Sequence, residues 1–470
     1  MTSRPLSSRA AARAELLVYR IAGLPVAVRK LFDRRDQTSA DVIRAAYALA
    51  YWQSGWDNIG EIAVATVLWP IGLLAASLWF TALNGAAIRR RENKGFVRQF
   101  SEQIRLYFTA GILPPWYYIF GLHRAPEDAG GYLQRSETKG GIYPLLRRGV
   151  WTELNDKRVF ADFCASNDLP CVPYLFCLDG SEVPQSLPDC DLFVKPANGR
   201  GGRGAERWDC TAPDQFSSVD GQKITAQALL DHLVQRSETG PILVQRRVQS
   251  HPDLADLTSG ALSTVRVTTC LNERGDPEIV GAVFRMAIGG NRTVDNLHAG
   301  GIAAKVALDR GTLSSASDLG MDSKLGWLQR HPDSRAWIEG RTLPLWSETK
   351  ALAVRAHRSF TDRVLVGWDI AITGDGPLVV EGNSSPDLDI MQRFGVPICN
   401  SRFGELLAWH LVERGFAPPG QAASWSSSSS RPQISTSASV SSSIISAVCV
   451  GPGVKRKRSA PLGTVGKLIG

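Results

Sequence analysis

The chain has 470 residues, of which 44% are hydrophobic and 21% charged, as expected for a folded protein of two or three domains. Its formal net charge of +8 suits anionic partners such as nucleotides or a membrane surface, while no basic repeat interleaved with aromatic residues indicates nucleic-acid binding. The eight cysteines contain no CxxC pair, which argues against a disulfide framework or a zinc site and favours a reducing compartment.

Residues 1–60 predict a basic helical arm. Apolar side chains recur at roughly helical spacing between Leu17 and Leu31, with basic residues between them. Such an arm could lie on a membrane surface or pack on the rest of the protein. The first twenty residues lack the apolar run of a secretory signal.

Residues 62–88 carry no charged side chain, and we predict a transmembrane helix over 61–88. Pro70 and Gly72 would kink it, but both residue types are tolerated in membrane helices. A buried helix or a re-entrant hairpin is the alternative. Three arginines follow at 89–91, and the positive-inside rule then places the C-terminal part in the cytoplasm, at the inner or plasma membrane. Without a spanning helix the protein would be cytoplasmic.

Three further regions follow. Residues 89–150 have the composition of a mainly helical linker region, and residues 151–417 predict a folded body of strands and helices. Residues 418–470 form a Ser-rich tail that cannot bury enough apolar surface to order itself, so we predict that it is disordered.

A lysine and a glycine-rich loop lie early in the folded body. Lys157 precedes a predicted helix over 158–167, and Lys195 lies in a predicted strand over 191–196. The loop after this strand could present successive backbone N–H groups to phosphate oxygens through Gly199, Gly201, Gly202 and Gly204. No dinucleotide-binding acid follows at the expected distance, and no kinase catalytic loop exists. Taken alone, the loop could be only a flexible turn.

Three predicted strands come next. The backbone of the strand over 242–248 could hydrogen-bond the edge of an adenine. The strands over 263–269 and 279–286 each hold one arginine, Arg266 and Arg285, inside an apolar run. Such arginines are commonly surface residues, but paired on neighbouring strands they would suit a developing anionic centre.

A predicted hairpin, with strands over 367–372 and 378–383, carries acidic residues between apolar neighbours. Asp369 and Glu381 should therefore lie in or near a core, where a carboxylate is unfavourable unless a cation satisfies it. Two carboxylates and the amide oxygen of Asn383 form a set of hard oxygen ligands suited to Mg²⁺. The alternative is a hairpin with an incidental buried acid.

In chain order, these motifs resemble the ATP-grasp superfamily: a lysine, Lys-Pro with a glycine loop, a hinge strand and Asp…Glu-x-Asn. Thr264-Val265-Arg266, Phe284-Arg285-Met286, the run 295–301 and Gly367-Trp368-Asp369 resemble its sugar-transfer-associated branch, which is related to alpha-L-glutamate ligases. The resemblance covers roughly residues 95–412. It implies an α+β ATP-grasp fold, with two α/β lobes that clamp ATP, preceded here by the helical, membrane-associated N-terminal region.

The resemblance also implies roles for individual residues. Lys157 and Lys195 would contact the ATP phosphates, and Gly199, Gly201, Gly202 and Gly204 would close over them. Gln245, where many relatives have glutamate, and Val248 would meet the adenine. Magnesium would be bound by Asp369, Glu381 and Asn383, and the catalytic arginines would be Arg266 and Arg285. The substrate would contact Asn296, His298, Gly300 and Gly301.

The function implied is that of an ADP-forming ligase. It would activate a small-molecule carboxylate as an acyl phosphate, join it to an amine-bearing acceptor and serve polysaccharide or glycan modification. The alternatives are an ATP-binding accessory subunit of a glycan-assembly complex without ligase turnover, or a small-molecule kinase.

Overall fold

The computed structural model describes residues 21, 23–32, 38–56, 59–149, 151–180, 182–198, 202–291, 293–297, 300–322 and 325–417. All of them fall in the first of two compact units, residues 1–430. The Ser-rich tail predicted over 418–470 therefore lies outside the described residues, and its predicted disorder stays a prediction.

The N-terminal region is helical, as predicted. Residues 23–32 form a helix, and within the described residues one helix, Ile62–Glu92, is long and apolar enough to cross a membrane. Whether it crosses one stays a prediction. The helices are α2 (Ser39–Trp56), α3 (Ile59–Glu92), α4 (Phe96–Ala110), α5 (Pro114–Ile119), η1 (Pro126–Gly131), α6 (Arg135–Glu137), η2 (Thr138–Ile142) and α7 (Tyr143–Leu146).

The first part of the body holds a six-stranded antiparallel sheet in the order β1-β6-β2-β3-β4-β5. One face of this sheet packs against α9, and the shared apolar cluster includes Leu192, Val194 and Leu229. The elements are η3 (Glu153–Asn155), α8 (Lys157–Ser166), β1 (Phe176–Leu178), β2 (Leu192–Pro196), β3 (Glu206–Ala212), β4 (Gln215–Ser218), β5 (Lys223–Thr225), α9 (Ala226–Ser237) and β6 (Ile242–Arg246).

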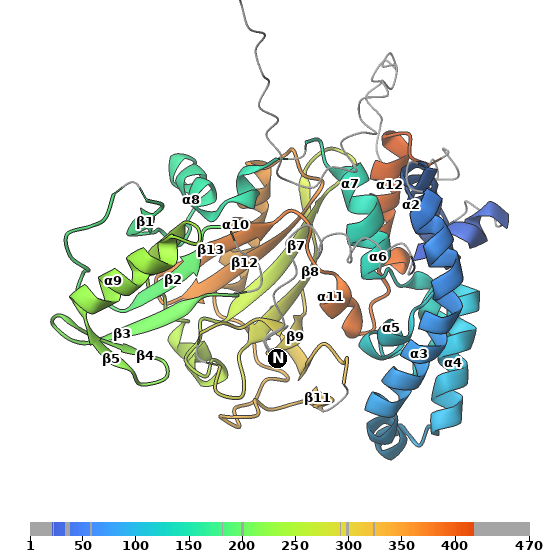
Figure 1. Ribbon diagram of the computed structural model, residues 1–470, viewed down its shortest axis with the longest axis horizontal. Coiled ribbons are helices and arrows are strands. Elements are labelled where there is room, and N and C mark those ends of the chain that lie inside the picture. Colours follow the sequence, from blue (N-terminus) through green and yellow to red (C-terminus); the bar gives the residue numbers. More distant parts are fainter. Residues whose placement is uncertain are drawn as a thin grey trace, which may run out of the picture. The chain divides into compact units, whose positions relative to one another are not determined.

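The second part holds a seven-stranded sheet in the order β11-β10-β9-β8-β7-β12-β13, drawn in yellow and orange in Figure 1. The elements are η4 (Pro252–Leu257), β7 (Thr264–Leu271), β8 (Pro277–Met286), β9 (Ile302–Val306), β10 (Leu313–Ser317), β11 (Trp327–Leu328), α10 (Trp346–Arg358), β12 (Leu365–Thr373), β13 (Gly376–Asn383), α11 (Asp389–Arg393), η6 (Ile398–Asn400) and α12 (Arg402–Glu413).

The two faces of the larger sheet differ because side chains alternate along each strand. In β12, Val366, Trp368 and Ile370 enter a hydrophobic cluster with α10 and with Phe160 of α8. Asp369 therefore projects from the opposite face. The burial predicted for Asp369 is confirmed, since its carboxylate is held on the face opposite to the fully buried Trp368.

The described part of the N-terminal arm packs on the body. Val42, Ala46 and Tyr47 of the arm share a hydrophobic cluster with Phe403 and Leu407 of α12. For these residues the structure therefore favours packing on the protein, which was one of the two alternatives that the sequence left open.

The strands and helix predicted around the motifs are confirmed. The strand over 191–196 is β2, the strand over 242–248 is β6, and the arginine-bearing strands are β7 and β8. The hairpin is β12–β13, and the helix after Asn155 is α8. Asp156 begins α8, because its carboxylate accepts hydrogen bonds from the backbone N–H groups of Arg158 (2.8 Å) and Val159 (3.3 Å).

We predict that Gln392→Ala lowers the free energy of unfolding by about 2–4 kcal/mol. The fully buried Gln392 amide accepts from Leu133 N (2.9 Å) and donates to Leu133 O (2.7 Å), and the substitution leaves both backbone groups buried without these partners. Urea denaturation of both proteins measures the loss. The exposed Gln222→Ala is the control. An equal loss of stability in the two variants would show that the hydrogen bonds between Gln392 of α11 and Leu133 do not stabilise the fold.

Candidate functional site

Three charged residues lie in one row across neighbouring strands. Arg266 of β7 is the register partner of Asp369 in β12, and Asp369 is the partner of Glu381 in β13. Directly paired residues project to the same face, so their side chains meet. A β-bulge at Val380 shifts the register after this row, and bulges of this kind often re-aim side chains beside functional sites.

The Asp369 carboxylate is held between two guanidinium groups. Arg266 Nε donates to Asp369 Oδ1, Arg266 Nη2 lies 2.9 Å from Oδ2, and Arg285 Nη2 lies 3.1 Å from the same oxygen. The side chain of Asp369 is 2% exposed. Burial alone would raise the pKa of Asp369, but Arg266 and Arg285 outweigh it and lower that pKa to about 2. The cation required by this buried acid is thus supplied by the protein itself.

Arg285 is anchored by a second carboxylate that the sequence motifs contained but for which we had predicted no role. Asp295 Oδ1 lies 3.1 Å from Arg285 Nη2, and Asp295 Oδ2 accepts from both Thr264 N (2.8 Å) and Thr264 Oγ1 (2.6 Å). Thr264 Oγ1 in turn accepts from Arg285 Nε and Nη2. Thr264 and Arg285 are register partners in β7 and β8. Pairing of the two arginine-bearing strands, which the sequence suggested, could have indicated this contact.

Lys195 of the smaller sheet lies within electrostatic range of Glu381 of the larger sheet. Lys195 projects from the face of β2 opposite to the cluster that holds Val194. Burial lowers the pKa of Lys195 to about 8, while the charge of Glu381 opposes that shift and the charge of Lys157 adds to it. The backbone of Lys157 donates to Ala197 O (3.3 Å), so α8 begins beside the end of β2. The structure therefore brings both predicted lysines to the side of the acidic hairpin.

The glycine loop is described from Gly202 onward, and Gly199 and Gly201 lie outside the described residues. Gly202 and Gly204 have φ angles of 70° and 71°, in the left-handed region. A Cβ on Gly202 would lie 2.9 Å from Val294, so this glycine permits close approach to the segment that contains Asp295 and Asn296. Loop and segment come from different sheets, so the two parts of the body meet here.

The expected adenine contacts are only partly accessible. Gln245 is buried, and its amide nitrogen donates to Val172 O (3.0 Å) and Pro173 O (3.3 Å). This side chain therefore fixes the segment before β1, so only its backbone remains as a candidate adenine contact. Val248 is half-buried, just after β6. The adenine role of both residues stays a prediction.

The predicted substrate residues lie in the turn before β9. Asn296 O accepts from Gly301 N (3.1 Å), Gly300 has a φ angle of 90°, and Gly301 is buried. His298 lies outside the described residues. Asp295, at the start of this turn, pairs with Arg285, which also contacts Asp369. The turn therefore lies beside the row of charged residues on β7, β12 and β13.

The donor set fits a divalent cation at Glu381 and Asn383. Asn383 Nδ2 donates to Glu381 Oε1 (3.2 Å), both side chains are half-buried, and the other donor of the predicted set, Asp369, lies beside Glu381. Among the described residues, no group of three His, Cys, Asp or Glu side chains is arranged to hold a metal ion. The amide oxygen of Asn383 and the phosphates of a bound nucleotide would have to complete the coordination.

Comparison with known proteins identifies a family. Residues 145–397, more than half of the chain, match a family described as "Sugar-transfer associated ATP-grasp". Among curated protein sequences, none matches the chain.

Solved structures with a similar fold have low sequence identity. D-alanyl-alanine synthetase A from Vibrio cholerae is 14% identical over 56% of this chain and 65% of its own, with a TM-score of 0.32. A D-alanine–D-alanine ligase from Bacillus anthracis complexed with ATP is 10% identical over 56% of this chain and 67% of its own, with a TM-score of 0.33. N5-carboxyaminoimidazole ribonucleotide synthetase in an ADP complex is 10% identical over 50% of this chain and 46% of its own, with a TM-score of 0.29. The chain spans about half to two thirds of the length of these proteins, and at these scores the similarities carry no argument.

We predict that Asp369→Asn destabilises the protein by about 3–5 kcal/mol, because it leaves the largely buried guanidinium groups of Arg266 and Arg285 without their shared counter-charge. Thermal or urea unfolding measures the loss. Asp375→Asn, in the exposed turn of the same hairpin, is the control and should change little. A stability equal to that of the unsubstituted protein would show that the two ion pairs do not hold the sheet.

The burial of Lys195 predicts that the free energy of unfolding depends on pH. The pKa of Lys195 is about 8 in the folded chain against 10.5 for an unperturbed lysine, so between these values the unfolded chain binds a proton that the folded chain has released. The free energy of unfolding therefore rises with pH across this window, by up to about 3 kcal/mol, and the penalty is complete below pH 8. Lys195→Met should lack this rise, whereas Lys223→Met, on the exposed edge strand, should retain it. Urea titrations at several pH values measure the slopes, and equal slopes in all three proteins would refute a buried Lys195.

Proposed function

The chain belongs to the sugar-transfer-associated ATP-grasp family, and from this membership we propose that it is an ATP- and Mg²⁺-dependent, ADP-forming ligase that joins a carboxylate to an amine. The observation that carries the proposal is the electrostatic interaction of Lys195 with Glu381, which come from two different sheets, together with the pairing of Glu381 with Asp369 and of Asp369 with Arg266. Cationic and anionic groups that face each other across two lobes can bind a metal–nucleotide complex from both sides.

The first lobe would bind the triphosphate. Lys157 and Lys195 supply positive charge next to the glycine loop, whose described glycines, Gly202 and Gly204, adopt the left-handed conformation that aims backbone N–H groups at an anion. The lowered pKa of Lys195 fits this role, because a bound phosphate would favour the protonated ammonium and remove the cost of its burial. Gln245, through its backbone in β6, and Val248, two residues after β6, would border the adenine.

The acidic hairpin would hold magnesium through Glu381, Asn383 and Asp369. Bound there, the ion would neutralise the charge of the β- and γ-phosphates. Glu381 and Asn383 are half-buried and adjacent, whereas Asp369 is already neutralised by two arginines, so Glu381 and Asn383 should make the larger contribution to metal affinity.

Arg266 and Arg285 would stabilise negative charge that develops on the transferred phosphoryl group or on the tetrahedral centre. Asp369 and Asp295 hold the two guanidinium groups in place, so little reorganisation is needed when that charge appears. A free carboxylate is a poor acyl donor, and phosphorylation supplies a leaving group that an amine can displace. Asn296, Gly300 and Gly301, in the turn fixed by Asp295, border the position expected for the substrate, and His298 belongs to the same run.

The substrate class proposed is a small-molecule carboxylate with an amine-bearing acceptor of a polysaccharide or glycan pathway, and the support for the glycan link is the family's name. The catalytic body would work in the cytoplasm, at the inner or plasma membrane. The apolar helix Ile62–Glu92, long enough to reach across a bilayer, supports the membrane location.

The test is ADP release by the purified full chain, with ATP, Mg²⁺ and panels of carboxylates, amino acids and amino sugars. Glu381→Gln should lower the rate by about 100-fold or more, because it removes a metal-binding charge without changing side-chain size. Glu238→Gln, exposed just after α9, is the matched control and should retain activity. Full activity of Glu381→Gln would refute the metal assignment.

The products distinguish the alternatives. Phosphorylated product without a ligated one would mark a small-molecule kinase. ATP binding without ADP release under any combination of substrates would mark an accessory subunit. The contacts of Arg266 and Arg285 with Asp369 favour this alternative, because they neutralise one of the three predicted metal ligands.

A further inference from the structure

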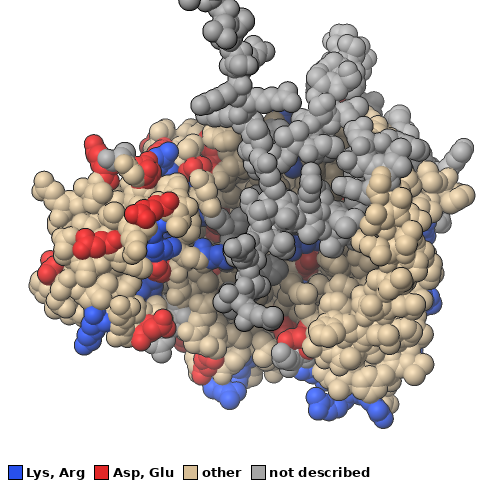
Figure 2. All heavy atoms as spheres, viewed as in Figure 1, with Lys and Arg blue, Asp and Glu red and all other residues tan. Residues whose placement is uncertain are grey.

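The outer face of α3 is a continuous strip of exposed apolar side chains. From residue 64 to 83, spacing of three or four residues keeps the strip on one side of the helix, over about 28 Å. The side chains are 42–69% exposed: Val64, Val67, Leu68, Ile71, Leu74, Leu78, Trp79 and Leu83. In Figure 2 the surface over α3 and α4 is mostly tan, with blue side chains at its lower edge. An apolar strip of this length marks an interaction surface.

The opposite face of α3 is buried and carries polar side chains among apolar ones such as Leu73 and Ile88. Ser77, Thr81 and Asn84 recur at helical spacing and are at most 7% exposed. Thr81 Oγ1 accepts from Gln103 of α4 (2.7 Å), and Asn84 donates to Met321 O (3.0 Å). A helix on the surface of a soluble protein exposes mainly polar side chains, whereas α3 exposes apolar ones and buries several polar ones. The outer face of α3 is therefore built for an apolar environment.

The helix that follows α3, α4, packs against α3. Lys94 pairs with Glu102 of α4 (2.7 Å), and Glu102 also accepts from Tyr117 of α5 (2.6 Å). Nearer the start of α3, Trp69 stacks on Tyr107 of α4 with ring centroids 5.5 Å apart. A helix that crossed a bilayer alone would lose these contacts, or would draw α4 and its buried charges into hydrocarbon.

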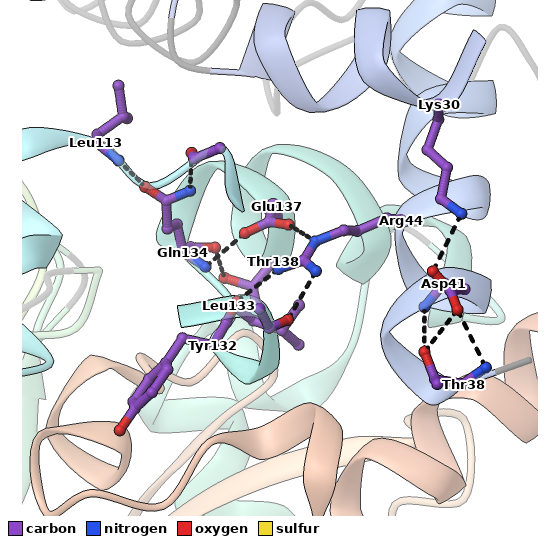
Figure 3. A network of polar contacts seen from close by, with 12 residues as sticks. Lys30, Thr38, Asp41, Arg44, Leu113, Tyr132, Leu133, Gln134, Glu137 and Thr138 are labelled. Atoms are coloured by element: carbon purple, nitrogen blue, oxygen red, sulfur yellow. Dashed lines mark hydrogen bonds and ion pairs between the residues drawn. The ribbon is translucent and has the colours of Figure 1, made fainter. Parts of the chain in front are cut away.

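The chain before α3 is bound to the same body. α2 packs on α12, and Arg44 of α2 donates to Glu137 Oε1 (3.1 Å), Gly130 O (2.7 Å) and Tyr132 O (3.0 Å), contacts that Figure 3 shows. Glu137 is fully buried and also accepts from Gln134 N (2.8 Å). The residues that precede α3 and those that follow it are thus attached to one folded unit.

We propose that α3 does not cross the membrane but lies in the plane of one leaflet, with its exposed strip in the acyl region and its polar face on the protein. A helix whose two flanks are bound to one folded unit cannot place them on opposite sides of a bilayer. Both flanks and the catalytic body would then lie on the same side. This mode of attachment goes beyond the proposed ligase activity and does not depend on it.

The occupant of the strip is an anionic phospholipid leaflet. Three exposed arginines, at 89–91, occupy the last turn of α3, and Arg98 and Arg105 are exposed on α4. A cavity of about 370 Å³ at this end is lined by Leu83, Ala86, Ala87, Arg90, Arg91 and Asp322. Guanidinium groups beside an apolar strip complement anionic headgroups above acyl chains, and an interfacial helix uses both attractions. A protein partner would have to supply an apolar groove along the whole strip.

The first test is topology. The full chain is expressed in bacteria with one epitope tag at each end, and protease is added to inverted membrane vesicles and to spheroplasts. An in-plane helix predicts that both tags are cleaved in inverted vesicles and that both are protected in spheroplasts. Protection of only the N-terminal tag in inverted vesicles would establish a spanning helix and overturn the proposal. A chain that does not sediment with membranes would overturn it as well.

The second test is vesicle flotation of the purified full chain. Binding should strengthen when phosphatidylglycerol is added to phosphatidylcholine vesicles and should persist in part at high salt, because the apolar contact is not screened. The double variant Ile71→Glu with Leu78→Glu should reduce binding by roughly tenfold or more. Both side chains are more than 60% exposed, so thermal unfolding should be unchanged.

Val183→Glu is the matched control, since Val183 is 54% exposed on the smaller sheet's side of the body. It should bind vesicles as the unsubstituted chain does. Unaltered binding of the double variant would refute the strip as the lipid-contacting surface. A dimer in solution that the double variant dissociates, with no vesicle binding by either protein, would replace the leaflet by a second copy of the chain. ADP release is measured separately, so failure of the ligase proposal leaves these outcomes interpretable.

Discussion

The sharing of Asp369 between Arg266 and Arg285 is the constraint on which the rest of the candidate site depends. A carboxylate that is almost fully buried costs several kcal/mol unless charges and hydrogen bonds compensate it, and here the compensation comes from β7 and β8. The balance requires three strands in the correct register. A shift of one residue would turn one of the charged side chains to the opposite, apolar face of the sheet. Asp295 then fixes the second arginine, so the turn before β9 inherits the same constraint.

Much of this arrangement could be predicted from the sequence. Apolar runs identified β7, β8, β12 and β13, and the Lys-Pro and glycine pattern identified β2 and its loop. The reasoning that a buried Asp369 needs a cation is confirmed, because Arg266 and Arg285 contact it, whereas its predicted role as a Mg²⁺ ligand stays a prediction. Which cation satisfies a carboxylate depends on strand order and register, and neither can be read from local patterns. The bulge at Val380 is a further example, because nothing in a Leu-Val-Val run indicates an extra residue.

Other features escaped prediction because they depend on contacts distant in sequence. Gln245 lies in a strand whose backbone suits adenine, but its amide is committed to the carbonyls of Val172 and Pro173. The prediction for residues 62–88 rests on their lack of charge, and it does not distinguish the exposed apolar face of the helix from the face that packs on the protein. Ser77, Thr81 and Asn84 recur at helical spacing, and this pattern could have indicated the face that packs on protein.

The lipid-facing layer proposed here is continuous with the site through α5 and α11. Trp116 of α5 donates to Asp389 of α11 (3.0 Å), and Arg393 of α11 donates to Tyr118 O (2.6 Å). α11 follows directly on the loop after Asn383, so the segment that leaves the acidic hairpin is bound to the helices that pack beneath α3. An anchor that lies in one leaflet, unlike a flexible tether, would therefore hold the acidic hairpin at a defined distance from the membrane. This would suit an acceptor that is itself attached to lipid, because the reacting groups of enzyme and acceptor would then be confined to the same layer.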